Sequence, residues 1–217
     1  MKLQNRVQKK TINIVEIFES LQGEGRYAGT PMLFIRLGGC NRRCWFCDTK
    51  YSWTDYKPYS IDKIVKIVKK SKLNNVCFTG GEPLLQFNAI REIKNQVKDS
   101  KTFHLETNGD LINNRNVQQL FKVFKYVACS PKELATAQKV HDLLSGYSKE
   151  IYDIKVVTDL KKEGVDMIKY ATILMPLTFY DKRDKMILKK VWWYCTKHNI
   201  RFSPRLQFFI FGKKKKI

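Results

Sequence analysis

Three cysteines lie close together in the segment Cys40-Asn-Arg-Arg-Cys44-Trp-Phe-Cys47, directly after an apolar run and two glycines. Soft thiolates select zinc or iron-sulfur clusters. A structural zinc site closes with four ligands, whereas this segment offers three cysteines and no nearby histidine. Three thiolates suit a 4Fe-4S cluster with one open iron, which can bind a substrate or a second cofactor directly. The spacing therefore predicts an oxygen-sensitive cluster on Cys40, Cys44 and Cys47.

The remaining cysteines and the histidines show no ligand spacing. The sequence places them within strand or helix patterns, and we expect small core residues or structural side chains at Cys77, Cys129, Cys195, His104, His141 and His198.

Four polar segments each follow a short β-rich run. They occupy residues 38–41, 79–83, 106–109 and 130–132. In parallel α/β architectures, ligands bind at the carboxyl ends of the strands. We therefore expect these segments to converge on one mouth.

Strand-like and helix-like patterns alternate along the chain. The strand-like runs lie at 14–18, 32–37, 76–80, 103–107, 126–130, 151–157, 171–176 and within 201–211. The helical patterns lie at 61–70, 84–97, 116–122, 161–170 and 183–198. This alternation predicts a mostly parallel sheet with helices packed outside. Because about six or seven parallel strands fall short of a closed eight-stranded barrel, the expected fold class is α/β, a partial, open TIM-like barrel.

Length and composition set the remaining limits. The 217 residues fit one domain, 1–217, with a short basic tail at 213–217. No run approaches the roughly 18 apolar residues of a membrane span, and no secretory pattern follows the amino terminus, so we expect a cytoplasmic protein. The net charge of +21 is spread over nearly every helical segment without interleaved aromatic residues. Direct nucleic-acid binding is therefore disfavoured.

The motifs together resemble the 7-carboxy-7-deazaguanine synthase family of the radical S-adenosylmethionine superfamily. C-x3-C-x2-C is the signature of the superfamily. The resemblance is carried by SLQGEGRYAGTPMLFIRLGGCNRRCWFCDTKY (20–51), TGGEPLLQ (79–86), ETNG (106–109) and SPK (130–132). These segments follow one another in order, so the resemblance covers essentially the whole chain.

The resemblance implies a reaction. S-adenosylmethionine would chelate the open iron and be cleaved to a 5'-deoxyadenosyl radical. That radical would abstract hydrogen from 6-carboxy-5,6,7,8-tetrahydropterin, which contracts its ring, loses ammonia and becomes 7-carboxy-7-deazaguanine, a 7-deazapurine on the route to queuosine. The cofactors carry this chemistry, and the protein supplies position and a dry site.

The resemblance also implies roles for individual residues. Arg36 would pair with the substrate carboxylate, for which a guanidinium is well suited, and Thr49 would bind Mg²⁺ together with that carboxylate. Further substrate contacts are implied for Leu21, Gln22, Gly23, Glu24, Thr79 and Gln207. S-adenosylmethionine contacts are implied for Phe46, Asp48, Gly80, Gly81, Glu82, Glu106, Thr107, Asn108, Ser130, Pro131 and Lys132.

The carboxy-terminal segment departs from the family pattern. Related sequences carry a histidine in the final strand, whereas SPRLQFFIFG has Gln207 there. An amide can hydrogen-bond a pterin but does not titrate near neutrality.

The resemblance implies an oligomeric state and an electron donor. The family implies a homodimer, and a flavodoxin or ferredoxin electron donor could dock on a basic face.

Two alternative functions remain: an activase that abstracts hydrogen from a glycine of a partner protein, and a basic iron-sulfur module that binds RNA. The QGEG segment before the cysteines and Thr49 after them argue against the activase, and the four strand-end motifs argue against the RNA-binding module.

Overall fold

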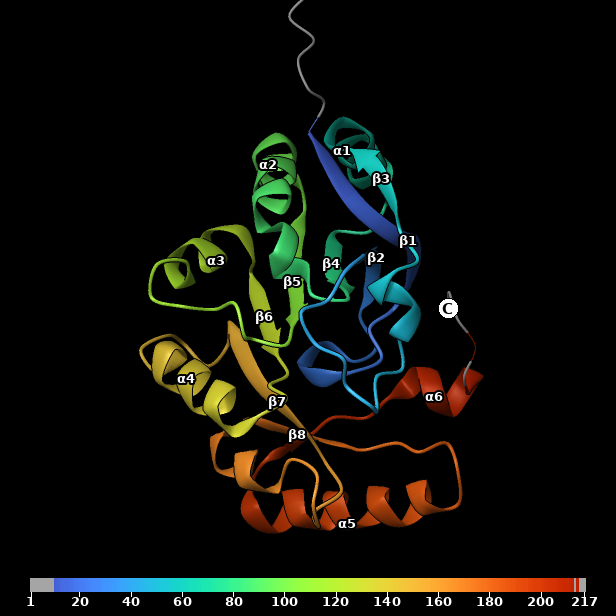
Figure 1. Cartoon of the computed structure of the whole chain (residues 1–217), viewed down its shortest axis with the longest axis vertical. Helices are drawn as coiled ribbons and strands as arrows, with labels where there is room; N and C mark the ends of the chain where they lie inside the picture. The colour runs from blue at the N-terminus through green and yellow to red at the C-terminus, as the bar shows by residue number, and fades with distance from the viewer. Residues whose placement is uncertain (1–9, 213, 215–217) are drawn as a thin grey trace, which may run out of the picture.

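The computed structural model describes residues 10–212 and Lys214 (Figure 1). Apart from Lys214, the basic tail predicted at 213–217 therefore lies outside the described residues.

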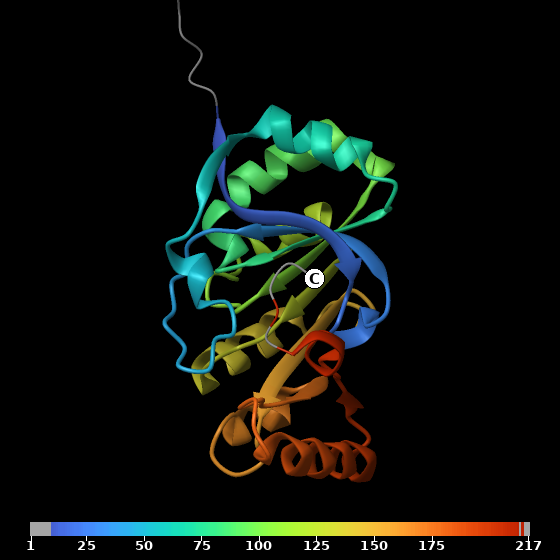
Figure 2. The same cartoon turned by 90° about the vertical axis from the view of Figure 1, so that its right-hand side faces the viewer.

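Within the described residues, nine strands form one sheet in the order β3-β1-β2-β4-β5-β6-β7-β8-β9. The strands are β1 (Thr11–Leu21), β2 (Pro31–Leu37), β3 (Lys57–Ser60), β4 (Asn75–Gly80), β5 (Thr102–Thr107), β6 (Tyr126–Cys129), β7 (Tyr152–Thr158), β8 (Ile173–Pro176) and β9 (Arg201–Phe202). From β2 through β4 to β9, each pair of neighbours is parallel, whereas β1 is antiparallel to both β2 and β3. The sheet curves strongly but its two edges, β3 and β9, do not meet (Figure 2). The predicted open, mostly parallel barrel is confirmed.

Helices follow the strands. They are α1 (Ile61–Lys70), α2 (Phe87–Val97), α3 (Val117–Val123), α4 (Leu134–Leu144), α5 (Arg183–His198) and α6 (Leu206–Phe211). Shorter 3-10 turns occur at Gly25–Tyr27, Lys50–Trp53, Pro83–Gln86, Lys98–Ser100 and Val165–Tyr170. In Figure 1, α1 to α5 form an arc around the outside of the sheet, while α6 lies apart from this arc.

The two faces of the sheet carry different side chains, because successive residues of a strand point to opposite faces. In β2, Leu33, Ile35 and Leu37 belong to the main core, which includes buried residues of α1 to α5. The residues between them, Met32 and Phe34, belong to a separate small cluster. The same alternation holds in β4, β5 and β7, so that the inner face receives the polar positions at the carboxyl ends.

Apart from the loop 22–30 between β1 and β2, the connections that directly precede the parallel strands contain none of the predicted site residues. The turn at 145–151, between α4 and β7, contains none of the predicted site residues, and its Gly146 has open space around its Cα atom. The site residues therefore come from the carboxyl ends of the parallel strands, from the loop 22–30 and from α6.

Four local predictions differ from the structure. The helix α4 is absent from the elements that the sequence predicts, although Ala137, Val140 and Leu144 have helical spacing. Strand β3 was also not anticipated, and the helix expected at 161–170 is a 3-10 turn over Val165–Tyr170.

Of the strand or two predicted within 201–211, only β9 (Arg201–Phe202) forms, and a strand is the wrong prediction after Phe202. Ser203 still donates its backbone N–H to Leu174 of β8, but Leu206 donates to Gly23, so the chain has left the sheet. It continues as α6, which carries Gln207.

Membrane insertion has no support in the described helices: none of them combines the length and the apolar character that crossing a bilayer requires.

Candidate active site

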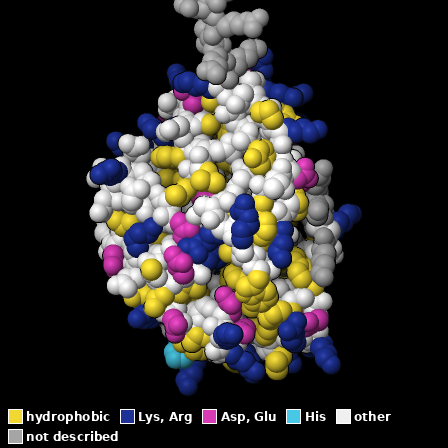
Figure 3. All heavy atoms as spheres, in the orientation of Figure 1, with side chains coloured by type: hydrophobic (Ala, Val, Ile, Leu, Met, Phe, Trp, Pro, Cys, Tyr) yellow, Lys and Arg dark blue, Asp and Glu magenta, His cyan; other side chains and the backbone are white. Residues whose placement is uncertain are grey.

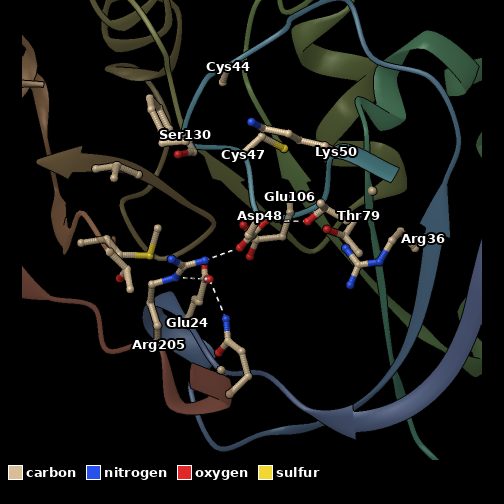
Figure 4. A pocket seen from close by; sticks show the side chains of 18 of the residues that line it. Glu24, Arg36, Cys44, Cys47, Asp48, Lys50, Thr79, Glu106, Ser130 and Arg205 are labelled. Carbon is tan, nitrogen blue, oxygen red and sulfur yellow. Dashed lines mark hydrogen bonds and ion pairs between the residues drawn. The ribbon is translucent and has the colours of Figure 1, made fainter. Parts of the chain in front are cut away.

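A cavity of about 670 Å³ opens at the carboxyl ends of the parallel strands (Figure 4). Its lining includes the three predicted cluster cysteines, and every other predicted site residue except Glu82 and Pro131. Segments that are far apart in the sequence therefore meet at one place, as expected for strand ends of a parallel barrel.

The loop that carries the three cysteines follows β2. Hydrogen bonds to the loop after β5 fix its position. Asp110 accepts two hydrogen bonds from Arg42, at 2.5 and 2.7 Å, and a third from Asn41 at 2.7 Å. Asn41 in turn accepts a bond of 2.8 Å from Asn108. A bidentate guanidinium-carboxylate pair fixes orientation as well as distance, so Asp110 positions the loop that carries the thiols.

The paired glycines at the end of β4, Gly80 and Gly81, pack directly against this loop. Gly81 donates its N–H to the carbonyl oxygen of Leu37, and Glu82 donates to Gly39. A Cβ atom on Gly81 would lie 1.9 Å from the Gly39 oxygen, and Gly80 has φ of +126°. Only glycine allows this approach of two backbones.

The Glu82 carboxylate is fully buried and does not reach the cavity surface. It accepts hydrogen bonds from Thr107 Oγ1 and the backbone N–H groups of Asn108 and Leu84, at 2.7 to 3.0 Å. Burial raises the pKa of Glu82 to about 7 although these donors act in the opposite direction. Glu82 therefore joins the glycine loop to the loop after β5, and it does not line the cavity.

The donor set fits an iron-sulfur cluster. All three loop cysteines are free thiols that are partly exposed and line the same cavity. Burial raises the pKa of the Cys40 and Cys47 thiols, so ligand binding would have to release their protons. No three His, Cys, Asp or Glu side chains among the described residues could share a single metal ion. A 4Fe-4S cluster does not need such a group, since it binds one thiolate at each of three irons.

The β1–β2 loop, residues 22–30, brings Glu24 to a second carboxylate, on β5, and to a buried lysine. Lys155 of β7 donates to Glu24 at 2.7 Å and to Glu106 of β5 at 3.0 Å. Gln22 donates to the other oxygen of Glu106 at 3.2 Å. Burial alone would raise the pKa of Glu24, but the charges of Lys155 and Arg205 hold it well below its usual range.

Helix α6 and the residue before it close the other side of Glu24. Arg205 donates to Glu24 at 3.1 Å and Gln207 donates to the same oxygen at 2.8 Å. Arg205 also pairs with Asp48 (Figure 4). Asp48 accepts from the Thr49 hydroxyl at 2.5 Å, so a continuous polar chain runs from Glu24 through Arg205 and Asp48 to Thr49.

Arg36 lines the cavity and has a partner inside the protein. Its Nε donates to Glu16 at 2.6 Å, and the Tyr51 hydroxyl donates to the same Glu16 oxygen at 2.9 Å. The internal carboxylate orients the guanidinium, whose outer nitrogens remain the groups that could meet a carboxylate ligand.

Ser130 and Lys132 lie at the end of β6. Lys132 donates to Ser130 at 2.8 Å and its ammonium lies 5.7 Å from the centre of the Phe46 ring. Burial lowers the pKa of Lys132. Phe46 packs on Val157, Met175 and Leu177, which form an apolar wall, and Pro131 is buried behind this end of β6.

Sequence reasoning missed several residues of the site. The most important are Lys155, Arg205, Asp110 and Glu16. One signal was available for Lys155: the strand Tyr152–Thr158 alternates apolar Ile154 and Val156 with charged Asp153 and Lys155. Charged residues on one face of a fully buried strand indicate a polar interior. For Arg205, the residue before α6, no signal is available, because the pattern of the segment that follows it predicts a strand.

Comparison with known proteins places the chain in a class. Residues 34–188, more than half of the chain, match the family model of the radical SAM superfamily. The fold agrees with the crystal structure of QueE from Escherichia coli, with a TM-score of 0.55 at 19% identity, covering 89% of this chain and 93% of that one. The chain belongs to the radical SAM superfamily, which implies a 4Fe-4S cluster and S-adenosylmethionine as cofactors.

Two relatives make the assignment narrower. The 7-carboxy-7-deazaguanine synthase of Hyperthermus butylicus is 31% identical over 92% of both chains. That of Thermoplasma acidophilum is 51% identical over a shorter stretch, about half of each chain (45% of this chain and 47% of the relative). The chain is a radical SAM enzyme of the 7-carboxy-7-deazaguanine synthase family. The family resemblance inferred from the motifs is confirmed, and it favours the synthase over both the activase and the RNA-binding module.

Proposed function

We propose that this enzyme converts 6-carboxy-5,6,7,8-tetrahydropterin into 7-carboxy-7-deazaguanine with loss of ammonia. One observation carries the proposal: the residues of four separated motifs line a single cavity, with three free thiols at one side and a cluster of carboxylates and amides at the other. Family membership supports the same reaction.

The cavity divides into two parts with different chemistry. Near the cysteines, Gly80, Gly81 and Asn108 offer backbone and amide groups to the methionine moiety, while Ser130, Lys132 and Phe46 border the adenosine side. The cluster and S-adenosylmethionine supply the radical that abstracts hydrogen. We assign the predicted cofactor contacts to this part, except the more deeply buried Glu82 and Pro131 and except Glu106, which bonds Gln22 and Lys155 beside Glu24 in the other part.

The other part suits a pterin. Gln22, Glu24 and Gln207 present amide and carboxylate groups that match the donors and acceptors of the ring edge. Arg36 would take the substrate carboxylate, and Thr49 and Thr79 lie along the same lining. The apolar wall of Val157, Met175 and Leu177, with Phe46 packed on it, would exclude water from the reacting carbon.

Magnesium is part of the proposal. A single hydroxyl is a poor Mg²⁺ site alone, so Thr49 would bind the ion only together with the substrate carboxylate and water. Thr49→Val should raise the Mg²⁺ concentration needed for half-maximal turnover, whereas Thr49→Ser, which keeps the hydroxyl, should not. An equal Mg²⁺ requirement in both variants would remove Thr49 from the site.

The reaction is tested directly with the anaerobically reconstituted enzyme. It is reduced with S-adenosylmethionine and Mg²⁺, given the pterin, and the products are followed by mass spectrometry. We expect 7-carboxy-7-deazaguanine, lost in Cys44→Ala but kept in Cys195→Ala, a cysteine outside the cavity. Formation of 5'-deoxyadenosine without the deazaguanine would keep the radical chemistry and reject the substrate.

The proposed reaction also suggests a cellular compartment and an electron donor. A single domain with three thiols that must stay reduced suits the cytoplasm, and a flavodoxin or ferredoxin would supply the electron.

A homodimer is proposed on the face of α5 and α6. Trp192, Trp193, Phe209 and Ile210 are each more than half exposed, and hydrophobic side chains gather over this region at the lower right of Figure 3. A contiguous apolar patch of this kind marks an interface. Light scattering should give twice the chain mass, and Trp193→Lys should give the single mass.

A further inference from the structure

Lys155 is an unusual residue to find inside this cavity. It is 2% exposed, lies on the inner face of β7, and belongs to none of the motifs that identify the family. An ammonium group is costly to bury unless ionised partners surround it. Its two partners, Glu24 and Glu106, come from different elements and both line the cavity.

The charges of this triad depend on one another. Burial alone would lower the pKa of Lys155, but Glu106 and Glu24 raise it above its usual value. With two carboxylates and one ammonium the triad carries a net negative charge, and Arg205 balances it from the α6 side of Glu24. Without Lys155, two carboxylates would face each other in a buried site.

The triad also leaves hydrogen-bonding capacity toward the cavity. A carboxylate oxygen accepts two hydrogen bonds, and each oxygen of Glu106 accepts one from the described residues, from Gln22 and from Lys155. Glu24 Oε2 likewise accepts one, from Lys155. The side chains of Glu24 and Glu106 are 18% and 20% exposed, so these acceptors are accessible from the cavity.

We infer that Lys155 is a positioning residue that holds Glu24 and Glu106 side by side as paired acceptors for a heterocycle with adjacent N–H donors. An aminopyrimidinone edge, with its exocyclic amino group and ring N–H, has this pattern. The inference rests on the proposed function and adds to it the reason why an aminopyrimidinone ring is selected over a ring without the amino group.

The first test replaces the ammonium with an apolar chain of similar length. In Lys155→Met we expect KM for the pterin to rise by about tenfold to a hundredfold while kcat falls by less than about tenfold, because a uniform binding interaction is lost. Lys101→Met is the matched control: Lys101 donates to the carbonyl oxygens of Ser71 and Leu73, outside the cavity, and its KM should stay unchanged. An unchanged KM in Lys155→Met would overturn the inference.

A second variant covers the case in which Lys155→Met unfolds. Lys155→Met combined with Glu106→Gln removes one negative charge, so it should recover the thermal stability of the wild-type enzyme. It should not recover KM, because an amide offers one acceptor and two donors in place of two acceptors. A double variant with wild-type KM would show that the paired acceptors are not used.

Binding measured by calorimetry separates this inference from the proposed reaction. The reconstituted wild-type enzyme should bind 7-carboxy-7-deazaguanine at least about tenfold more tightly than the same ring without its amino group, and Lys155→Met should reduce this preference. If the enzyme makes no deazaguanine but keeps the preference, the reaction is wrong and the inference stands. Equal affinity for the two rings would refute the inference whatever the reaction.

Discussion

Gly81 fixes the distance between two loops of the active site. Its Cα approaches the Gly39 carbonyl so closely that a methyl group has no room, and the neighbour is backbone that cannot rotate away. We expect Gly81→Ala to lower the free energy of unfolding by about 2 kcal/mol or more and to reduce the iron bound per chain after reconstitution. Gly146→Ala, at an open position, should change neither quantity. Full iron content in Gly81→Ala would mean that the cysteine loop tolerates displacement.

His104 makes stability depend on pH. Its ring is buried, with Nε2 bonded to Asn75 at 3.1 Å, and burial lowers its pKa to about 4. Since the unfolded chain takes up a proton near pH 6.5 and the folded chain does not, stability is lost as the pH falls from about 6.5 to about 4. The loss from this residue should reach about 2 kcal/mol between pH 7 and pH 5. Urea unfolding at both pH values should show a smaller decrease for His104→Phe than for the wild-type protein.

At the scale of elements, the buried carboxylate of Asp153 joins the β1–β2 loop, residues 22–30, to the barrel. Asp153 of β7 accepts from Arg26 at 2.8 Å, from Tyr126 at 2.8 Å and from Thr172 at 2.7 Å, and Arg201 of β9 lies 3.3 Å away. Arg26 is only two residues from Glu24. The position of Glu24 therefore depends on a contact outside the cavity.

Removing this carboxylate should uncouple the loop from the sheet. Asp153→Ala leaves two guanidinium groups without their anion, and we expect a loss of about 3 kcal/mol in the free energy of unfolding, measured by urea denaturation. Asp142→Ala, on the exposed surface of α4, serves as the control and should cost less than about 0.5 kcal/mol. A similar small cost for Asp153→Ala would contradict the role assigned to it.

The sequence predicted the central elements well and the carboxy-terminal ones poorly. Strands such as β2 and β4 have strong patterns because both of their faces are buried, and the helix at 183–198 agrees with α5. The segment after Phe202 failed because LQFFIF has β-forming residues, while its actual structure depends on contacts with Gly23 and Glu24 that are distant in sequence.

The candidate site shows the same contrast. Cys40, Gly81 and Glu24 belong to motifs with characteristic spacing and could be found from the sequence alone. Lys155 and Arg205 could not, since their roles arise from partners on other strands and helices and not from neighbours in the chain.

For the whole molecule, the charge of +21 should affect electron delivery. Lysine and arginine side chains spread over the face seen in Figure 3. The long-range electrostatic attraction between this basic protein and an acidic electron donor is screened by salt. Reduction by an acidic flavodoxin should slow by about tenfold between about 50 and about 300 mM salt, measured as the rate of 5'-deoxyadenosine formation. Reduction by photoreduced 5-deazariboflavin, which is uncharged, should be insensitive to salt; an equally salt-independent flavodoxin rate would argue against electrostatic docking.

The position of the cysteine and glycine loops at the carboxyl ends of the strands has a practical consequence for protein engineering. The turn at 145–151 precedes β7, at the amino end of that strand, and the carbonyl oxygen of Lys149 in this turn accepts from Arg26 at 2.6 Å. Gly146 is exposed with open space around it. Added residues in such a turn cost little, because the ends of the loop stay in place. A fluorescent protein or an affinity tag inserted after Gly146 should leave the loops at the carboxyl ends untouched while the contact between Lys149 and Arg26 stays in place. This gives a route to immobilise the enzyme in an anaerobic flow reactor with its cavity facing the solution.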